Sequence, residues 1–192
     1  SFKFSIYDDL FTIAFDNVSI FKLFVKLLTP NNLEITLSMA IRWNYDAIMR
    51  YFFDTVINEY FSLTSLSAIN ILLESVEKKT DDQFNFILDK IKEINSKFLS
   101  NNSQLKRVLD RACSLKKIEI AKTIIDIMVE NDQKHDFTDC FIGASASHAI
   151  DVCIYLVEKK LNINFELISN YFSELGSMNE DVFDTIAKSV TP

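Results

Sequence analysis

The chain has 192 residues, of which 48% are hydrophobic, and a formal net charge of −7. That length and apolar content suffice for a buried core and exclude a disordered chain, while the acidic balance argues against a nucleic-acid-binding surface. Only 2 glycines and 2 prolines are available for tight turns, so we do not expect a β-sandwich, a barrel or a glycine-rich nucleotide-binding loop.

The first apolar segment, residues 10–28, predicts a helix pair. It reads LFTIAFDNVSIFKLFVKLL, in which Ala14 precedes a polar break at Asp16 and Asn17. Lys22 and Lys26 interrupt the apolar run further, so it is poorly suited to crossing a bilayer, and it lacks a signal-peptide cleavage site. After the break, apolar residues recur at helical spacing: Ile20, Phe21, Leu23, Phe24 and Leu27.

Residues 37–54, LSMAIRWNYDAIMRYFFD, predict a second helix pair. A single straight helix would have to rotate its apolar stripe to bury both ends of this segment, whereas a turn at Trp43–Asn44 lets each helix bury its own face. Asn44 suits the turn because asparagine tolerates a left-handed backbone and can cap the following helix. The two apolar sets are Leu37, Ala40 and Ile41 before the turn, and Ala47, Ile48, Tyr51 and Phe52 after it.

The same plan recurs along the chain. Ala112 precedes Lys116–Lys117, and Ala144 precedes Ser147–His148, while two weaker copies place Ser75 and Ser173 at the alanine position. Small residues there allow close approach between first helices, and bulky residues on the second helices fill the spaces between pairs. The intervals between the six anchors bracket ~33 residues, the size of a helix-pair repeat. The anchors are Ala14, Ala40, Ser75, Ala112, Ala144 and Ser173.

Polar intervals at residues 29–32, 93–106 and 130–139 predict the loops between pairs. We expect the longest loop at 93–106, where Asn101, Asn102 and Ser103 are typical of a loop followed by a helix N-cap. None of these intervals has the composition of a long flexible linker, so we expect a single helical-repeat domain over residues 1–192.

This pattern resembles a divergent ankyrin-repeat array. The Asn44 turn with Tyr51–Phe52, and Lys116–Lys117 with Ile124–Ile125, match its two-helix plan, and IYLVEKKLNIN resembles the second-helix ending LLLEKGANVN with Lys160 in place of glycine. No copy contains TPLH, and Asn17, Asn44, Lys116 or His148 stands where glycine is usual. The resemblance implies an all-α fold of stacked antiparallel helix pairs, a short α-solenoid of about five to six degenerate repeats. A generic helical bundle or another helical solenoid is the alternative.

Side chains capable of chemistry are present without a typical catalytic or metal-binding spacing. Cys140, His148, Asp151 and Cys153 include metal-capable groups, but paired ligands such as C-x₂-C or H-E-x-x-H are missing. We interpret them as a turn histidine and buried cysteines. Acidic pairs at 8–9 and 81–82 and the run at 179–181 are typical of helix starts, and lysine pairs at 78–79, 116–117 and 159–160 of solvated helix ends. We expect no catalytic, cofactor-binding or metal-binding residues and no cofactor.

Two functions remain open. The first is a non-catalytic protein–protein interaction scaffold, as the resemblance implies. The second is an acidic helical regulator of the inhibitor or immunity type that blocks a basic partner protein. In both cases the partner is another protein, and no nucleic acid, membrane or small-molecule substrate is expected. The three cysteines, an odd number at unrelated spacings, favour a reducing cytoplasm, which for a parasite or virus would be that of its host cell.

The predicted turn at residues 42–45 supplies the candidate partner-binding residues. Arg42, Trp43, Asn44 and Tyr45 lie near the end of a helix pair, and tryptophan and arginine often contribute most to binding energy at protein interfaces. Trp43 is also the only tryptophan in the chain. The alternative is that Trp43 packs onto Phe15 or an adjacent pair as part of the core.

Overall fold

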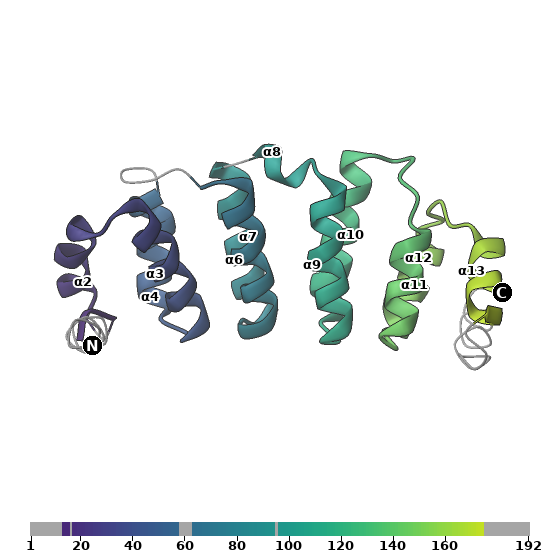
Figure 1. Cartoon of the computed structure of the whole chain (residues 1–192), viewed down its shortest axis with the longest axis horizontal. Coiled ribbons are helices and arrows are strands. Elements are labelled where there is room, and N and C mark those ends of the chain that lie inside the picture. The colour runs from purple at the N-terminus through teal and green to yellow at the C-terminus, as the bar shows by residue number, and fades with distance from the viewer. Residues whose placement is uncertain (1–12, 16, 58–62, 95, 175–192) are drawn as a thin grey trace. The chain divides into compact units, whose positions relative to one another are not determined.

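A computed structural model describes residues 13–15, 17–57, 63–94 and 96–174 (Figure 1). These residues form helices and turns, with one isolated bridge between Asp136 and Asn162 and no strand in the described part of the chain. The predicted all-α class is therefore confirmed. Two compact units divide the chain, Ser1–Asn95 (unit 1) and Ser96–Pro192 (unit 2), and the single domain expected over 1–192 stays a prediction.

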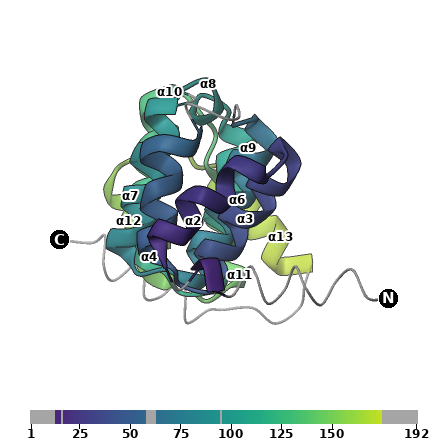
Figure 2. The same cartoon turned by 90° about the vertical axis from the view of Figure 1, so that its left-hand side faces the viewer.

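Unit 1 contains two complete helix pairs, α3 with α4 and α6 with α7, preceded by α2. The first helices α3 and α6 contact each other, and each contacts its own partner helix. Figure 2 shows α3 and α6 on one side of this unit and α4 and α7 on the other. The bounds are α2 Val18–Phe24, a 3₁₀ turn Val25–Leu27, α3 Pro30–Arg42, α4 Asp46–Tyr51, a π-helical turn Phe52–Val56, α6 Ser65–Lys78 and α7 Asp81–Ile94.

Unit 2 repeats this contact pattern with α9 and α10, then α11 and α12. The first helices α9, α11 and α13 contact one another in succession, and the second helices α10 and α12 are also in contact. The bounds are α8 Ser96–Leu99, α9 Asn102–Ser114, α10 Ile118–Asn131, α11 Thr138–Ala146, α12 Ile150–Glu158 and α13 Phe165–Glu174.

Three helix pairs turn through the same backbone motif. Asn44, Lys116 and His148 adopt left-handed conformations, with φ of 64°, 55° and 53°. In each case the next residue's N–H donates to the carbonyl of the anchor alanine five residues earlier, over 2.9 Å, which closes a Schellman-type helix end. These donor–acceptor pairs are Tyr45 to Ala40, Lys117 to Ala112 and Ala149 to Ala144. The predicted turn positions 44, 116 and 148 are confirmed.

The α6–α7 pair turns differently. Lys79 is extended, with φ of −111°, and Thr80 and Gln83 form a reciprocal capping box at the start of α7. The expectation that Lys79 belongs to a solvated helix end is wrong, because its side chain is fully buried. It lies there because its ammonium group donates hydrogen bonds to Asn44 and Asp46 of the preceding turn.

The core follows one register in these pairs. Each anchor is fully buried, and the residues one turn and two turns before it on the first helix are buried as well. On the second helices that follow a left-handed turn, buried apolar pairs lie four and five residues after it, and the residue eight positions after it is buried as well. The buried residues include Leu37, Ala40, Ile48, Met49, Phe52, Leu72, Ser75, Phe84, Ile87, Leu88, Leu109, Ala112, Ile120, Ala121, Ile124, Ile125, Phe141, Ala144, Val152, Cys153 and Leu156.

Second helices are also linked by a recurring surface network. In unit 1, the Arg50 guanidinium lies 4.4 Å from the centre of the Phe86 ring, and the Lys90 ammonium lies 3.0 Å from Asp54. In unit 2, Lys122 lies over Tyr155 at 5.6 Å, and Lys159 pairs with Asp126 at 3.0 Å. In each network, two residues four positions apart in one second-helix segment contact two residues four positions apart in the next one. Residues at this spacing lie on the same face of a helix, so both contacts can form between neighbouring helices.

Two loop predictions are wrong. Residues 29–32 are a helix start, because Thr29 is the N-cap of α3, its hydroxyl accepting from the Asn32 N–H, and Pro30 opens the helix. The long loop expected at 93–106 is interrupted by α8, although the predicted cap exists: the Asn101 side chain accepts from Ser103 and Gln104 at the start of α9. A loop does follow α10, between Asn131 and Thr138.

The first predicted pair is corrected in two respects. Asn17 has an extended backbone, with φ of −140°, and caps α2 rather than forming a left-handed turn. On α2 and the 3₁₀ turn that follows it, Phe21 is buried, but Ile20, Leu23 and Leu27 are 43%, 69% and 81% exposed, so most of the predicted apolar face is not core. The Ser173 copy, with Val182, Phe183 and Ile186, lies largely outside the described residues, as do the acidic residues at 8–9 and 179–181.

Candidate functional site

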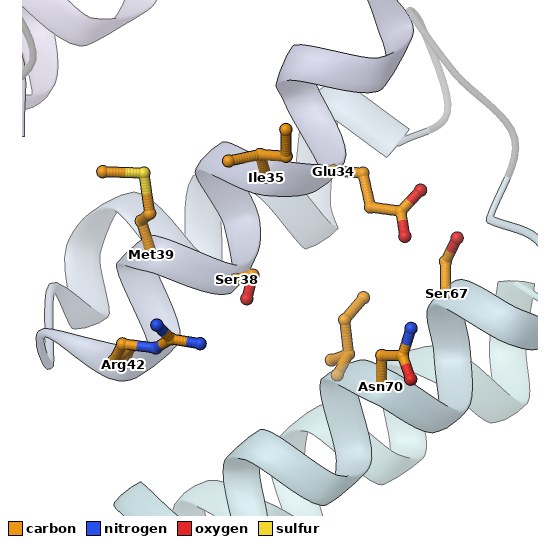
Figure 3. Close-up of a pocket in the computed structure, with 8 residues that line it drawn as sticks. Glu34, Ile35, Ser38, Met39, Arg42, Ser67 and Asn70 are labelled. Atoms are coloured by element: carbon orange, nitrogen blue, oxygen red, sulfur yellow. The ribbon is translucent and has the colours of Figure 1, made fainter.

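An open groove of about 440 Å³ lies between α3 and α6 of unit 1 (Figure 3). Its volume is within the range of protein ligand sites. The lining residues are Glu34, Ile35, Ser38, Met39, Arg42, Ser67, Asn70 and Ile71.

The helical repeat of α3 places two rows of side chains along this groove. Glu34, Ser38 and Arg42, spaced four residues apart, project toward α6, whereas Ile35 and Met39 lie along the outer side of the same helix (Figure 3). Ile35 is 57% exposed although it is a large aliphatic residue. The groove therefore combines a polar wall with an exposed apolar rim.

Glu74 of α6 fixes one end of the groove. One of its carboxylate oxygens accepts from the Arg42 Nε at 2.6 Å, and the other accepts from the Ser38 hydroxyl. The Glu74 side chain is only 12% exposed, while that of Arg42 is 58% exposed. Arg42 is thus positioned by a more buried carboxylate and keeps its terminal nitrogens available at the surface.

The other end carries polar groups without a bond to the described part of the chain. Glu34 is half-buried and forms no ion pair there, and Asn70 is exposed and forms no hydrogen bond there. Figure 3 shows Glu34 and Asn70 on opposite sides of the opening, near Ser67. These groups can accept and donate hydrogen bonds to an incoming molecule.

The four residues predicted from the sequence divide between the groove and the turn beside it. Arg42 lines the groove. Trp43 is 51% exposed, but one edge packs on Phe15, with ring centroids 6.1 Å apart. Tyr45 also packs on Phe15, at 4.9 Å, and is partly buried.

Asn44 has a structural role at this turn. Its backbone is left-handed, as expected, but its side chain does not cap α4, whose N-cap is Tyr45 without a side-chain bond. Instead the Asn44 Oδ1 accepts a 2.8 Å hydrogen bond from the buried Lys79 ammonium. Of the four residues, Arg42 and Trp43 are the two with large exposed side chains.

Sequence reasoning missed Ile35, Met39 and Glu74. A signal for the first two exists, because the buried stripe of α3 runs through Leu33, Leu37 and Ile41. Ile35 and Met39 fall outside this stripe and are apolar nevertheless. Glu74 gives no such signal, because its partner Arg42 comes from another helix.

The potential metal-binding and nucleophilic residues in unit 2 do not converge on a site. His148 is an exposed turn residue, whereas Cys113, Cys140 and Cys153 are buried. Burial raises the pKa of each of these thiols to about 12, so they are not activated nucleophiles. Among the residues that the structure describes, no three His, Cys, Asp or Glu side chains are grouped to hold a metal ion.

The remaining findings concern the chain as a whole. Asp81 and Asp82 occupy the first turn of α7, as predicted for helix-start carboxylates. No described helix combines the length and apolar character needed to span a membrane. Comparison with family models, curated proteins and solved structures found no match. The ankyrin resemblance stays a prediction.

Proposed function

We propose that this chain is a non-catalytic protein-binding scaffold, built as an ankyrin-like array of helix pairs, and that the α3–α6 groove receives a segment of its partner. The shared turn motif and the shared register of buried residues support the repeat array. Within each unit, neighbouring helix pairs contact each other, as stacked repeats do.

The groove is the observation that carries the binding proposal. Its apolar rim, the exposed Ile35 and the half-buried Met39, offers apolar surface that the described chain leaves uncovered. Arg42, anchored by Glu74, adds an exposed side chain of the type that often dominates binding energy. An apolar patch beside an ordered charged residue is a common arrangement at protein interfaces.

The test is affinity capture from the native cell followed by mass spectrometry, comparing the wild type with Ile35→Lys. We expect one specific protein to be lost with Ile35→Lys, because a charge would occupy the apolar rim, while circular dichroism stays unchanged. Leu115→Lys is the matched control: Leu115 is 39% exposed at the α9–α10 turn, outside the groove. An identical set of captured proteins for the wild type and Ile35→Lys would contradict the proposal.

The predicted contribution of the turn is tested by Trp43→Ala in the same capture experiment. Loss of the partner with little loss of stability would support Trp43 as a binding residue next to Arg42. Because Trp43 is 51% exposed, its removal should cost less than the ~3–5 kcal/mol of a fully buried tryptophan. A loss of that full size would instead assign it to the core with Phe15.

A further inference from the structure

The charges around the α3–α6 groove do not balance. Arg42 and Glu74 neutralise each other through their ion pair, and Glu34, two helical turns from Arg42, has no ion-pair partner in the described chain. The side chains that face the groove from α3 and α6 therefore carry one uncompensated negative charge. A partner group placed against Glu34 should be basic, because a like charge there would be repelled.

Apolar surface lies at a defined distance from this carboxylate. Met39 follows Glu34 by five residues on α3, which corresponds to ~7.5 Å along the helix axis. In an extended peptide, side chains two residues apart point to the same face and are ~6.6 Å apart. An extended segment that runs along α3 would therefore need a spacing of two residues to place a basic side chain at Glu34 and an apolar side chain at Met39.

Asn70 meets the requirements of a backbone contact for such a segment. Its amide forms no hydrogen bond within the described chain, and it faces the opening from α6 (Figure 3). A primary amide has one acceptor oxygen and two N–H donors, so it can bond to both the N–H and the C=O of one residue in an extended peptide. An extended backbone leaves these groups free, whereas a helix uses them internally.

Resting on the proposed function, we propose that the occupant of this groove is an extended segment of a partner protein with a basic residue, one intervening residue and an apolar residue. The basic side chain pairs with Glu34, the apolar side chain covers Ile35 and Met39, and Asn70 bonds to the N–H and C=O of the intervening residue. The partner is recognised by this local pattern and not by its overall charge.

The test is selection of random seven-residue peptides displayed on phage, using the wild type and Glu34→Lys as bait. The wild type should enrich peptides with Lys or Arg two residues before or after an apolar residue, and Glu34→Lys should exchange the basic position for Asp or Glu. For a synthetic wild-type-selected peptide, Glu34→Gln should weaken binding roughly fivefold, the effect of losing one partly exposed ion pair. Asp89→Lys is the control: Asp89 is an exposed α7 carboxylate with no ion pair in the described chain.

A second measurement tests the extended conformation. N-methylation of the backbone nitrogen of the intervening residue should weaken binding to the wild type, and Asn70→Ala should remove that difference. Enrichment of the same peptides by the wild type and Glu34→Lys, an equal effect of Asp89→Lys, or no enrichment would overturn the inference. A change of oligomeric state with Ile35→Lys in sedimentation would do so too, because the occupant would then be a second copy.

The proposed function and this inference fail separately. If cellular capture depends on Ile35 but the captured segment lacks the basic and apolar pair, the scaffold proposal stands and the inference is overturned. If the peptides bind as expected but Ile35→Lys changes no cellular capture, the proposed function fails.

Discussion

The two units use the same apolar register but stabilise their turns differently. In unit 1, the buried Lys79 ammonium lies 2.8 Å from Asn44 Oδ1 and 2.7 Å from Asp46 Oδ1, and so ties the α3–α4 turn to the α6–α7 turn of the next pair. In unit 2, the turn residues Lys116 and His148 are exposed. No lysine or arginine is buried in the described part of unit 2.

This difference shows that the interactions that close the turn within a helix pair are distinct from the interactions that join two neighbouring pairs. The backbone bond to an anchor alanine carbonyl closes the turn in both units, whether the left-handed residue is asparagine, lysine or histidine. Where the left-handed turn is missing, between α6 and α7, a capping box and the buried lysine take its place. The apolar register therefore tolerates more than one turn chemistry.

The largest expected effect concerns thiols, all of which lie in unit 2. The pKa of each thiol is raised to about 12 by burial, so labelling by a thiol reagent at pH 8 should be about a thousandfold slower in the folded chain than after unfolding. Release of thionitrobenzoate measures this, with three thiols expected in guanidinium. Rapid labelling of the folded chain would contradict the buried placement.

The raised pKa values of these thiols also predict that unit 2 loses folding stability at alkaline pH. Because their folded pKa lies above the unfolded value near 9, the stability they contribute is fully present below pH ~9 and is lost as pH rises toward 12. Denaturant midpoints at pH 8 and 10 should differ for the wild type, and the difference should shrink when the three cysteines are replaced by alanine.

Removing Asp46 should break the polar cluster that distinguishes unit 1. Asp46→Ala removes the carboxylate that lies 2.7 Å from the fully buried Lys79 ammonium, and we expect a loss of about 3 kcal/mol in the free energy of unfolding. Lys79→Met should cost less, since the Asp46 side chain is 39% exposed and can be hydrated. Trp43 fluorescence reports on unit 1, and Asp89→Ala is the control. Equal losses for the two cluster variants would contradict the asymmetry.

Overpacking an anchor tests the register that both units share. Ala112 is fully buried on α9, so Ala112→Leu should lower the free energy of unfolding by about 1–3 kcal/mol. Ala146→Leu on α11 adds the same side chain at an exposed position and should change stability little. An unchanged denaturation midpoint for Ala112→Leu would count against the helix-pair register.

The smallest effect concerns the left-handed turns. Lys116→Gly and His148→Gly should stabilise unit 2 by about 0.5–1 kcal/mol, because glycine adopts positive φ without steric cost. Asn44→Gly should give no gain in unit 1, since asparagine tolerates this conformation and the variant loses the bond to Lys79. Differential scanning calorimetry measures these shifts, and a gain for Asn44→Gly equal to that for Lys116→Gly would remove the distinction between the turns.

The sequence determined the helices and the positions of three turns. Local rules suffice there: apolar spacing set the buried faces at Ala40, Ala112 and Ala144, and polar residues at 44, 116 and 148 marked the turns. The same rules failed at α2, where apolar residues at helical spacing are exposed, because burial depends on which helices lie alongside.

Only the tertiary structure decided the candidate site and which charged side chains are buried or paired. Lys79 looks like a solvated helix end in the sequence, yet it is buried because Asn44 and Asp46 of another pair surround its ammonium. Glu74 acquires its role from Ser38 and Arg42, more than 30 residues away. Spacing along one helix predicts its own faces, but a groove between α3 and α6 exists only once two such faces are brought together.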